Sequence, residues 1–309
     1  MINHEQKPPL NLFFDVLSKK SHIPYKSGKP KNPQSVMKEV EQVLTHISEK
    51  NLKITHIVSF NDPILVFKAE SDVPVQKKFF CVKINSCIRA ATNEASILQA
   101  LSDRCNTSCR FFPQLENFFE IPSKKKHFAI VTEWVDTEPM YSVFKNSIKS
   151  LKMFTTQLVF LLHHLHASRV ISRDIKPSNL LLCKPYRTIL VCDFDLGIFL
   201  PDMKYTSYED MKVPGTPGFI DPAFFVKNSD LTKCDIYSAG KTLAALVANV
   251  EEKHVQKINT SHLVKMACSR IHSETHKKNF QDLLQLMLNR DSKKRGSTKD
   301  LIMHPFLCN

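Results

Sequence analysis

The stretch VISRDIKPSNLLL, from Val170 to Leu182, places basic, acidic and amide side chains in tight order between two apolar runs. Apolar runs rich in Val, Ile and Leu predict buried strands, and the polar centre with its proline predicts a loop. We therefore expect a strand, a loop that carries Asp174, Lys176 and Asn179, and a second strand. Chemistry-bearing side chains are often found on such loops between rigid elements.

The length and composition predict a soluble globular protein. The chain has 309 residues, of which 42% are hydrophobic, and this is enough for a substantial core. No run approaches the roughly 18 apolar residues that cross a membrane, and the start MINHEQKPPL lacks the apolar segment of a secretory signal. Nine cysteines, an odd number without a regular framework, fit a reducing compartment. We therefore expect a cytoplasmic or nuclear protein that does not associate with membranes.

Other kinds of site receive little support from the sequence. Cys105 and Cys109 have the spacing of half a zinc site, but no second Cys/His pair at ligand spacing follows. His163, His164 and His166 lie on an apolar helical pattern without a carboxylate, which favours packing over metal binding. The net charge of +13 admits nucleic acid or acidic proteins as partners, but no nucleic-acid-binding motif is present.

The composition of the chain and the spacing of its apolar residues change twice along the sequence. Residues 1–32 are rich in Lys, Pro and Asn and predict a flexible N-terminal extension. Short β-type runs follow between residues 53 and 135, interrupted by the helical stretch AATNEASILQALS. After Tyr141 the apolar periods are helical almost throughout, as in MFTTQLVFLLHHLH. The pattern predicts an α+β fold with a small β-rich lobe followed by a larger α-helical lobe.

A second motif, LVCDFDLG, adds Asp193 after another apolar run. Phosphoryl transfer needs a carboxylate to orient the attacking hydroxyl, a cation to offset developing charge, and oxygen ligands for Mg²⁺. Asp174, Lys176, Asn179 and Asp193 supply that set. Together the two motifs resemble the catalytic loop and the metal-binding motif of the eukaryotic protein kinases. The resemblance implies ATP and Mg²⁺ as cofactors and a protein as substrate, with Asn179 and Asp193 as metal ligands.

The resemblance extends over almost the whole chain after the extension. It implies a bilobal kinase domain at residues 33–309, with an N-lobe at about 33–135, a hinge at about 133–139 and a C-lobe at about 140–309. FFCVKI resembles the strand that carries the ATP-orienting lysine, Lys83, and NEASILQAL resembles the regulatory helix, whose glutamate is Glu94.

The same resemblance implies the remaining ATP contacts. VTEWVD resembles the hinge, with Thr132 as the gatekeeper and with Glu133 and Val135 offering backbone groups to adenine. Further contacts to the nucleotide fall on four apolar or thiol side chains: Val58, Val66, Cys81 and Leu181. In DIYSAG, Asp235 stands where the family braces its catalytic loop, and Arg295 stands at the place of a buried arginine. Lys176 and Thr216 resemble the serine/threonine branch of the family.

Four departures from the family pattern put activity in question. The phosphate-cradling loop corresponds to SFNDPI, residues 59–64, which contains no glycine, and Pro63 has no N–H group for phosphate. Ser172 replaces a histidine that packs beneath the metal-binding motif. The metal-binding motif ends in Asp195 rather than glycine, as it does in the MAP-kinase-interacting kinases. The segment DPA ends in Ala223, where a glutamate usually pairs with the buried arginine, and Asp221 is a candidate substitute.

Two functions from different classes remain open. An active serine/threonine kinase explains why every reacting group is present, whereas a pseudokinase that acts as a scaffold or allosteric regulator explains the lost glycines, Ser172 and Ala223. KPSN, GTPGF and HPF, together with IRAATNE, weakly resemble a cell-division-cycle kinase that is activated by a regulatory subunit, which makes such a subunit a candidate partner. CDFDLG resembles a different subfamily, so the subfamily stays open. Ser178 and Lys212 favour acidic residues around the target hydroxyl. Arg173 is a candidate to receive a phosphate from the activation segment at Tyr205, Thr206, Ser207 or Tyr208, and a polar loop that is never modified is the alternative.

Overall fold

The computed structural model describes residues 42–61, 64–71, 78–104, 111–122, 126–142, 144, 147–184, 186–199, 215–225 and 230–308. The chain divides into two compact units, one formed by residues 1–95 and 114–134 and the other by residues 96–113 and 135–309. Among the described helices, none has both the length and the apolar character needed to cross a bilayer.

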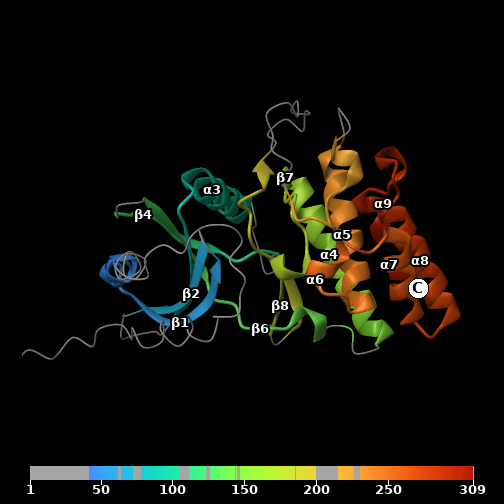
Figure 1. Ribbon diagram of the computed structural model, residues 1–309, viewed down its shortest axis with the longest axis horizontal. Coiled ribbons are helices and arrows are strands. Elements are labelled where there is room, and N and C mark those ends of the chain that lie inside the picture. The colour runs from blue at the N-terminus through green and yellow to red at the C-terminus, as the bar shows by residue number, and fades with distance from the viewer. Residues whose placement is uncertain are drawn as a thin grey trace, which may run out of the picture. The chain divides into compact units, whose positions relative to one another are not determined.

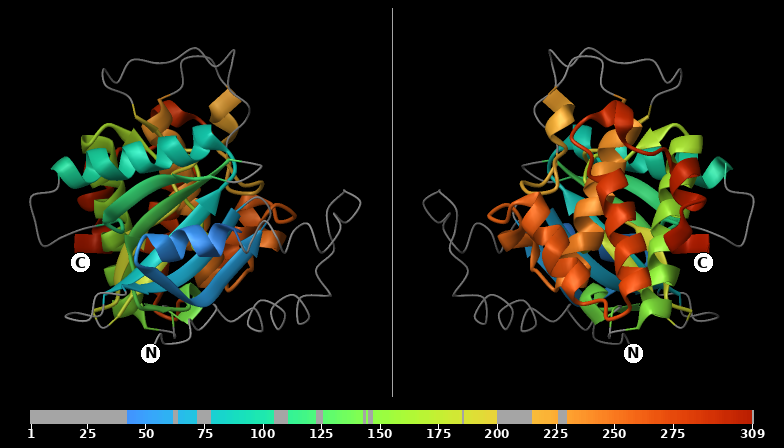
Figure 2. Two further views of the ribbon diagram at one scale, coloured as in Figure 1. Left: turned by 90° about the vertical axis from the view of Figure 1, so that its left-hand side faces the viewer. Right: turned by 90° about the vertical axis from the view of Figure 1, so that its right-hand side faces the viewer.

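The first unit is built on a five-stranded antiparallel sheet with the strand order β1-β2-β3-β5-β4 (Figure 1). The strands are β1 (Leu52–Asn61), β2 (Ile64–Ser71), β3 (Phe79–Asn85), β4 (Leu115–Ile121) and β5 (His127–Glu133). Side chains alternate along β3, so Val82 and Ile84 are buried in the core while Cys81 and Lys83 belong to the opposite face. The core face packs against a helix at residues 42–49, which supplies Val43 and Ile47 (Figure 2).

Helix α3 (Ile88–Arg104) follows β3 almost at once. The turn between them is closed by the Cys87 backbone N–H, which donates to the side-chain oxygen of Asn85 at 2.8 Å. Apolar residues recur at helical spacing, and Ala91, Leu98 and Leu101 are buried. The short connection brings the first turns of α3 back beside the strand that precedes it.

The second unit is mainly helical. Its two central helices, α4 (Ile148–Ala167) and α5 (Leu231–Ala248), pack against each other (Figure 1). Each begins at a capping side chain, because Ser147 accepts from a first-turn N–H in α4 and Asp230 does so in α5. Almost every residue of α5 is buried, which is typical of a helix at the centre of a domain.

Shorter elements complete the second unit. They are β6 (Thr137–Glu138), η1 (Met140–Ser142), β7 (Val170–Ile171), η2 (Pro177–Asn179), β8 (Leu180–Cys183), β9 (Thr188–Val191), β10 (Ile198–Phe199), η4 (Pro222–Phe225), α6 (Glu252–Val255), α7 (Thr260–Ser269), α8 (Glu274–Met287), η5 (Ser292–Lys294), α9 (Thr298–Ile302) and α10 (Pro305–Cys308). Strands β7 and β8 flank residues 172–179, so the strand, loop and strand predicted for VISRDIKPSNLLL are confirmed.

Candidate active site

In the first unit, Lys83 and Glu94 form a short ion pair. The Lys83 Nζ lies 2.6 Å from Glu94 Oε2, and the two side chains are 13% and 5% exposed. Lys83 is carried by β3 and Glu94 by the second turn of α3, so the tight turn between these elements sets the distance. Only ten residues separate the pair in the chain, which made it uncertain from sequence alone, but the structure brings the two charges together.

Three of the predicted nucleotide-contacting residues share the sheet face that carries Lys83. Val66 on β2 is the cross-strand partner of Lys83, and Cys81 on β3 is the partner of Thr132 on β5. Burial raises the pKa of the Cys81 thiol to about 11, although its hydrogen bond with Thr132 acts in the opposite direction. Cys81 is therefore a neutral, weakly polar side chain at physiological pH.

The other residues predicted to contact the nucleotide lie on several different elements. Val58 lies on β1 at an irregularity in the register and is 51% exposed. The Glu133 backbone N–H donates to the Gln114 carbonyl at 3.0 Å, and its side chain accepts from the Gln114 N–H. Val135 is the first residue of the second unit after β5, and Leu181 is half-buried in β8.

In the second unit, the Asp174 carboxylate is the centre of a hydrogen-bonded cluster. Its Oδ2 accepts from Lys176 Nζ at 2.6 Å and from Asn179 Nδ2 at 3.0 Å. Its Oδ1 accepts from the Thr216 hydroxyl at 2.8 Å, and Lys176 Nζ also donates to that hydroxyl at 2.7 Å. Asp174 is only 5% exposed, so its orientation is fixed by these partners. The cluster joins the loop before β8 to the segment that begins at Gly215.

Helix α5 fixes the backbone of the same loop. The buried Asp235 carboxylate accepts from the backbone N–H groups of Ser172 at 2.9 Å and Arg173 at 2.8 Å. Two turns further along α5, the Thr242 hydroxyl donates to the Ile175 carbonyl at 3.0 Å. The bracing expected from Asp235 is present, and Thr242 is a second anchor that sequence reasoning missed because a threonine inside a helix gives no distinctive signal.

A backbone hydrogen bond joins Asn179 to the residue that precedes Asp193. The N–H of Cys192, the neighbour of Asp193, donates to the Asn179 carbonyl at 2.9 Å. Because Asn179 donates to Asp174 through Nδ2, its Oδ1 is the atom left for a cation. An amide oxygen and a carboxylate are hard oxygen ligands, so the donor set fits Mg²⁺. Asp193 has φ of 70°, a left-handed conformation that is costly for a residue with a side chain and is often found at functional sites.

Ser172 differs from its surroundings because its hydroxyl has no hydrogen-bond partner within the described part of the chain, although the residue is only 1% exposed. Its backbone N–H is held by Asp235, so the backbone course does not depend on the side chain. The substitution of histidine by serine thus leaves a buried polar atom without compensation.

Asp221 supplies the anion that Ala223 lacks. Its two carboxylate oxygens lie 2.5 Å and 3.0 Å from Arg295 Nη1 and Nη2, and both side chains are fully buried. The remaining guanidinium N–H groups donate to the carbonyls of Lys233 and Asn289, and the guanidinium carbon lies 5.0 Å from the Tyr237 ring centroid. The substitute suggested by the sequence is therefore the observed partner of the arginine.

The three histidines of α4 have separate structural partners. His163 Nδ1 lies 3.0 Å from the Thr298 hydroxyl, and His166 Nε2 lies 3.1 Å from the Asp235 carboxylate. His164 packs against aromatic rings, and burial lowers its pKa. Within the described ranges, no group of three or more His, Cys, Asp or Glu side chains is arranged to hold a metal ion.

Sequence reasoning did not anticipate Glu252. This residue of α6 accepts hydrogen bonds from both the backbone N–H and the hydroxyl of Ser178, so it brings a carboxylate beside the catalytic-loop motif from 74 residues away. No local pattern signals such a long-range contact.

Several residues singled out in the sequence lie outside the described residues. They are the extension at residues 1–32, Asp62 and Pro63, Cys105 and Cys109, Tyr205, Thr206, Ser207, Tyr208 and Lys212.

Comparison with known proteins identifies the family. The protein kinase domain model matches residues 65–307, which is more than half of the chain. The chain is 29% identical to serine/threonine-protein kinase par-4 of Caenorhabditis briggsae over 234 residues, covering 69% of this chain and 33% of that protein. It is 25% identical to serine/threonine-protein kinase 36 of Mus musculus over 199 residues, covering 63% and 15%. It is 32% identical to serine/threonine-protein kinase PLK4 of Drosophila willistoni over 155 residues, covering 49% and 19%.

These curated relatives are much longer proteins, and the chain spans a third or less of the length of each. The match to the domain model covers the sheet of the first unit from β2 onward and the helices of the second unit, and the α+β fold class predicted from the sequence is confirmed. The chain belongs to the eukaryotic protein kinase superfamily and is of the serine/threonine type.

Proposed function

We propose that this chain transfers a phosphoryl group from ATP to serine or threonine hydroxyls of protein substrates. The observation that carries the proposal is the Asp174 cluster, in which a buried carboxylate is held by Lys176, Asn179 and Thr216 at 2.6 to 3.0 Å. A carboxylate so oriented can direct an attacking hydroxyl and take its proton, while the adjacent ammonium group offsets charge on the transferring group.

The groups proposed to contact the nucleotide and its metal ion are named for each unit separately. Lys83, oriented by Glu94, is the proposed phosphate-binding cation, and the side chains around Cys81 and Thr132 are the proposed adenine surroundings. Asn179 and Asp193 would hold Mg²⁺, which supplies charge neutralisation at the phosphates when it is bound. The kinase domain is proposed to cover residues 33–309, with the hinge near residues 133–139.

The test is a comparison of wild type with Asp174→Asn. This change keeps the side-chain shape but removes the carboxylate, so phosphate transfer to a generic serine/threonine substrate should fall at least about a hundredfold. The melting temperature and Mg²⁺·ATP affinity should stay close to wild type. Glu116→Gln, on the exposed surface of β4, is the matched control and should leave transfer unchanged. Equal transfer by wild type and Asp174→Asn, with a candidate activating subunit present, would contradict the proposal.

A second candidate function is that of a pseudokinase acting as a scaffold or allosteric regulator. Two observations favour it: residues 59–64 contain no glycine, and the Ser172 hydroxyl is buried without a partner in the described part of the chain. Calorimetric titration with Mg²⁺·ATP separates the two candidates at the first step. A pseudokinase without nucleotide affinity would release no binding heat, whereas the proposed kinase binds, and Lys83→Met weakens that binding.

We propose a preference for acidic residues near the target hydroxyl, but one feature of the site favours this preference and another opposes it. The absence of a carboxylate at Ser178 favours acidic residues near the target hydroxyl, as the net charge of +13 does. Glu252, however, places a carboxylate directly on Ser178 and so favours basic residues there. A peptide array with wild type and Glu252→Gln measures the balance: the acidic preference should increase in the variant if Glu252 opposes it.

A further inference from the structure

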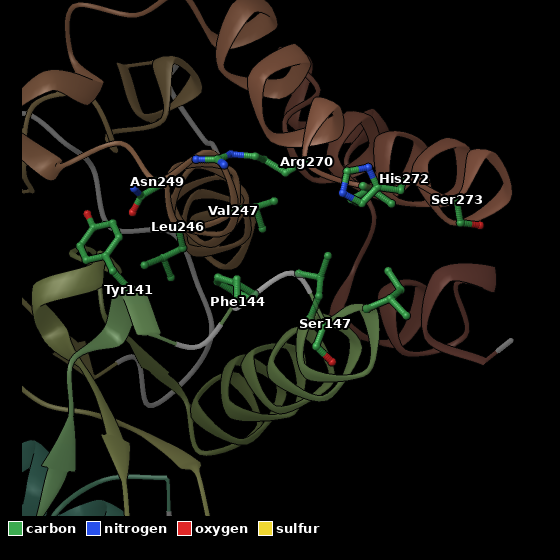
Figure 3. Close-up of a pocket in the computed structure, with 12 residues that line it drawn as sticks. Tyr141, Phe144, Ser147, Leu246, Val247, Asn249, Arg270, His272 and Ser273 are labelled. Atoms are coloured by element: carbon green, nitrogen blue, oxygen red, sulfur yellow. The ribbon is translucent and has the colours of Figure 1, made fainter.

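A pocket of roughly 400 Å³ opens in the second unit, away from the proposed active-site residues (Figure 3). It lies where η1 and the first turns of α4 meet the end of α5 and the connection between α7 and α8. None of the residues proposed to bind ATP, Mg²⁺ or the reacting hydroxyl lines it. Its volume falls within the range of small-molecule sites in proteins. The lining residues are Tyr141, Phe144, Ser147, Ile148, Leu151, Leu246, Val247, Asn249, Arg270, Ile271, His272 and Ser273.

The walls of the pocket are largely apolar. The Phe144 ring lies between α4 and the end of α5, and aliphatic side chains come from both helices (Figure 3). These apolar residues are Phe144, Ile148, Leu151, Leu246, Val247 and Ile271. An apolar body placed among them would remove hydrocarbon surface from water on both sides, which is the main driving force for ligand binding in such a site.

The polar part of the lining carries positive rather than negative charge. Arg270 ends α7 and extends toward Asn249 (Figure 3), and within the described residues no carboxylate forms an ion pair with it. His272 follows two residues later, and the described residues that line the pocket include no aspartate or glutamate. A guanidinium with an amide nearby presents several N–H donors, the geometry that suits a carboxylate.

The two glutamates that act on Tyr141 have partners outside the pocket. Glu251 and Glu252 affect Tyr141, whose pKa is raised to about 12 chiefly by burial, but neither glutamate lines the pocket. The Tyr141 hydroxyl stays protonated and donates to the Val250 carbonyl at 3.0 Å. Glu252 is engaged with Ser178. The charge that a ligand meets inside the pocket is therefore that of Arg270.

We propose that this pocket binds a small amphipathic carboxylate, with its apolar body between α4 and α5 and its carboxylate at Arg270. A purely apolar ligand would leave the Arg270 donors unused, and a compact anion such as phosphate would leave the apolar walls hydrated. The proposal does not depend on phosphoryl transfer, because no group of the proposed active site takes part.

The test uses octanoate as the probe, with octanamide and acetate as its controls. Octanamide keeps the apolar body without the charge, and acetate keeps the charge without the body. Calorimetric titration of the full chain should show saturable binding of octanoate, with octanamide at least about fivefold weaker, the effect of one partly exposed ion pair. Acetate should show no saturable binding over the same concentration range.

Two variants locate the site. Arg270→Gln should weaken octanoate by about fivefold and leave octanamide unchanged, and Arg290→Gln, an exposed arginine outside the pocket, is the matched control. Ile148→Phe should fill the pocket and reduce binding of both long-chain probes, with its melting temperature measured to show that the chain still folds. Asp174→Asn should bind octanoate as wild type does, which separates this site from the catalytic one.

Three outcomes would overturn the proposal. The first is the absence of saturable octanoate binding. The second is equal affinity for octanoate and octanamide, which would show that the charge is not recognised. The third is unchanged binding in both Arg270→Gln and Ile148→Phe, which would place any binding elsewhere.

Discussion

Arg295 has five N–H groups on its guanidinium, and all five face an oxygen acceptor in a fully buried site. Two of the acceptors are the carboxylate oxygens of Asp221, which neutralise the charge. A buried guanidinium without an anion is expensive because the protein interior solvates charge poorly. Because Arg295 is buried, it needs the Asp221 carboxylate to neutralise its charge. Removing that carboxylate is therefore expected to destabilise the fold strongly, since the guanidinium would stay buried without an anion.

The corresponding prediction is that Asp221→Asn lowers the free energy of unfolding by about 3–5 kcal/mol. Urea denaturation of the variant and wild type measures the difference. Glu274→Gln removes an exposed ion pair with Lys277 and should change stability by less than about 1 kcal/mol. A similar effect of both substitutions would show that the Asp221 pair is not solvated as poorly as its burial indicates.

Ser172 and Ser238 are both buried serines, but only the second has partners. The Ser238 hydroxyl lies 2.8 Å from the Phe219 carbonyl and 3.1 Å from the Cys234 carbonyl, whereas that of Ser172 has no partner among the described residues. Ser172→Ala should therefore leave the free energy of unfolding unchanged or raise it by up to about 1 kcal/mol, and Ser238→Ala should lower it by about 1 kcal/mol. Chemical denaturation of the two variants checks the order, and a marked loss of stability in Ser172→Ala would contradict it.

The raised thiol pKa of Cys81 predicts slow alkylation. An ordinary cysteine begins to ionise near pH 8–9, but burial moves this ionisation to about pH 11 at Cys81, so the reactive thiolate is scarce at pH 8. Iodoacetamide at pH 8 should label the exposed Cys87 and Cys308 well before Cys81, as followed by peptide mass spectrometry. Raising the pH toward 10 should narrow the difference. Equal labelling rates at pH 8 would show that Cys81 is more accessible than it is in the structure.

At the scale of elements, β4 is a strand that a regular alternation of polar and apolar residues does not indicate. Its sequence LENFFEI forms the edge of the sheet, where only Ile121 is fully buried, so polar and apolar residues do not alternate cleanly. The central strands β3 and β5 were predictable because they carry continuous Val, Ile and Phe runs that pack on the core. The helical character of α3 was also predictable, because its apolar residues recur at helical spacing. The short distance between its Glu94 and Lys83 depends on the turn between β3 and α3, and the spacing of apolar residues does not predict the geometry of a turn.

The hairpin of β1 and β2 carries the prediction on nucleotide affinity. Asn61 pairs with Ile64, so two residues, Asp62 and Pro63, connect the strands. An aspartate repels phosphate and a proline offers no N–H donor, so exchanging both for glycine should tighten Mg²⁺·ATP binding. Calorimetry on Asp62→Gly with Pro63→Gly, compared with Glu116→Gln as a control, measures the change. An unaltered dissociation constant would refute the electrostatic argument.

At the scale of the whole molecule, the sequence predicted the β-rich and helical parts because each has its own apolar period. It also predicted that Lys176 and Asn179 lie beside Asp174, because the three residues are within five positions of one another, whereas Thr216 reaches the same carboxylate from 42 residues away. It did not predict Thr242 or Glu252, whose contacts with the loop span 67 and 74 residues. Contacts of that separation depend on how whole elements pack, and a single sequence carries little information about them.

The predicted extension at residues 1–32 leads to a test on the full chain. Lysine, proline and asparagine make up 13 of its 32 residues, so we expect its deletion to leave the melting temperature within about 2 °C of wild type. Differential scanning calorimetry of the two proteins checks this, and deletion of residues 1–51, which removes Val43 and Ile47 from the core of the first unit, is the contrasting variant. A large loss from the shorter deletion would show that the extension is part of the folded domain.

The position of Asp221 also constrains how such a chain can have evolved. In a lineage that begins with glutamate at position 223, gaining Asp221 first keeps an anion at Arg295 throughout, and the glutamate is then free to be lost. The reverse order passes through an ancestor whose buried guanidinium has no counter-charge, and selection would remove it. A comparison of position 223 by itself therefore misses the ion pair of this chain, whereas a comparison of positions 221 and 223 together includes the carboxylate that neutralises Arg295.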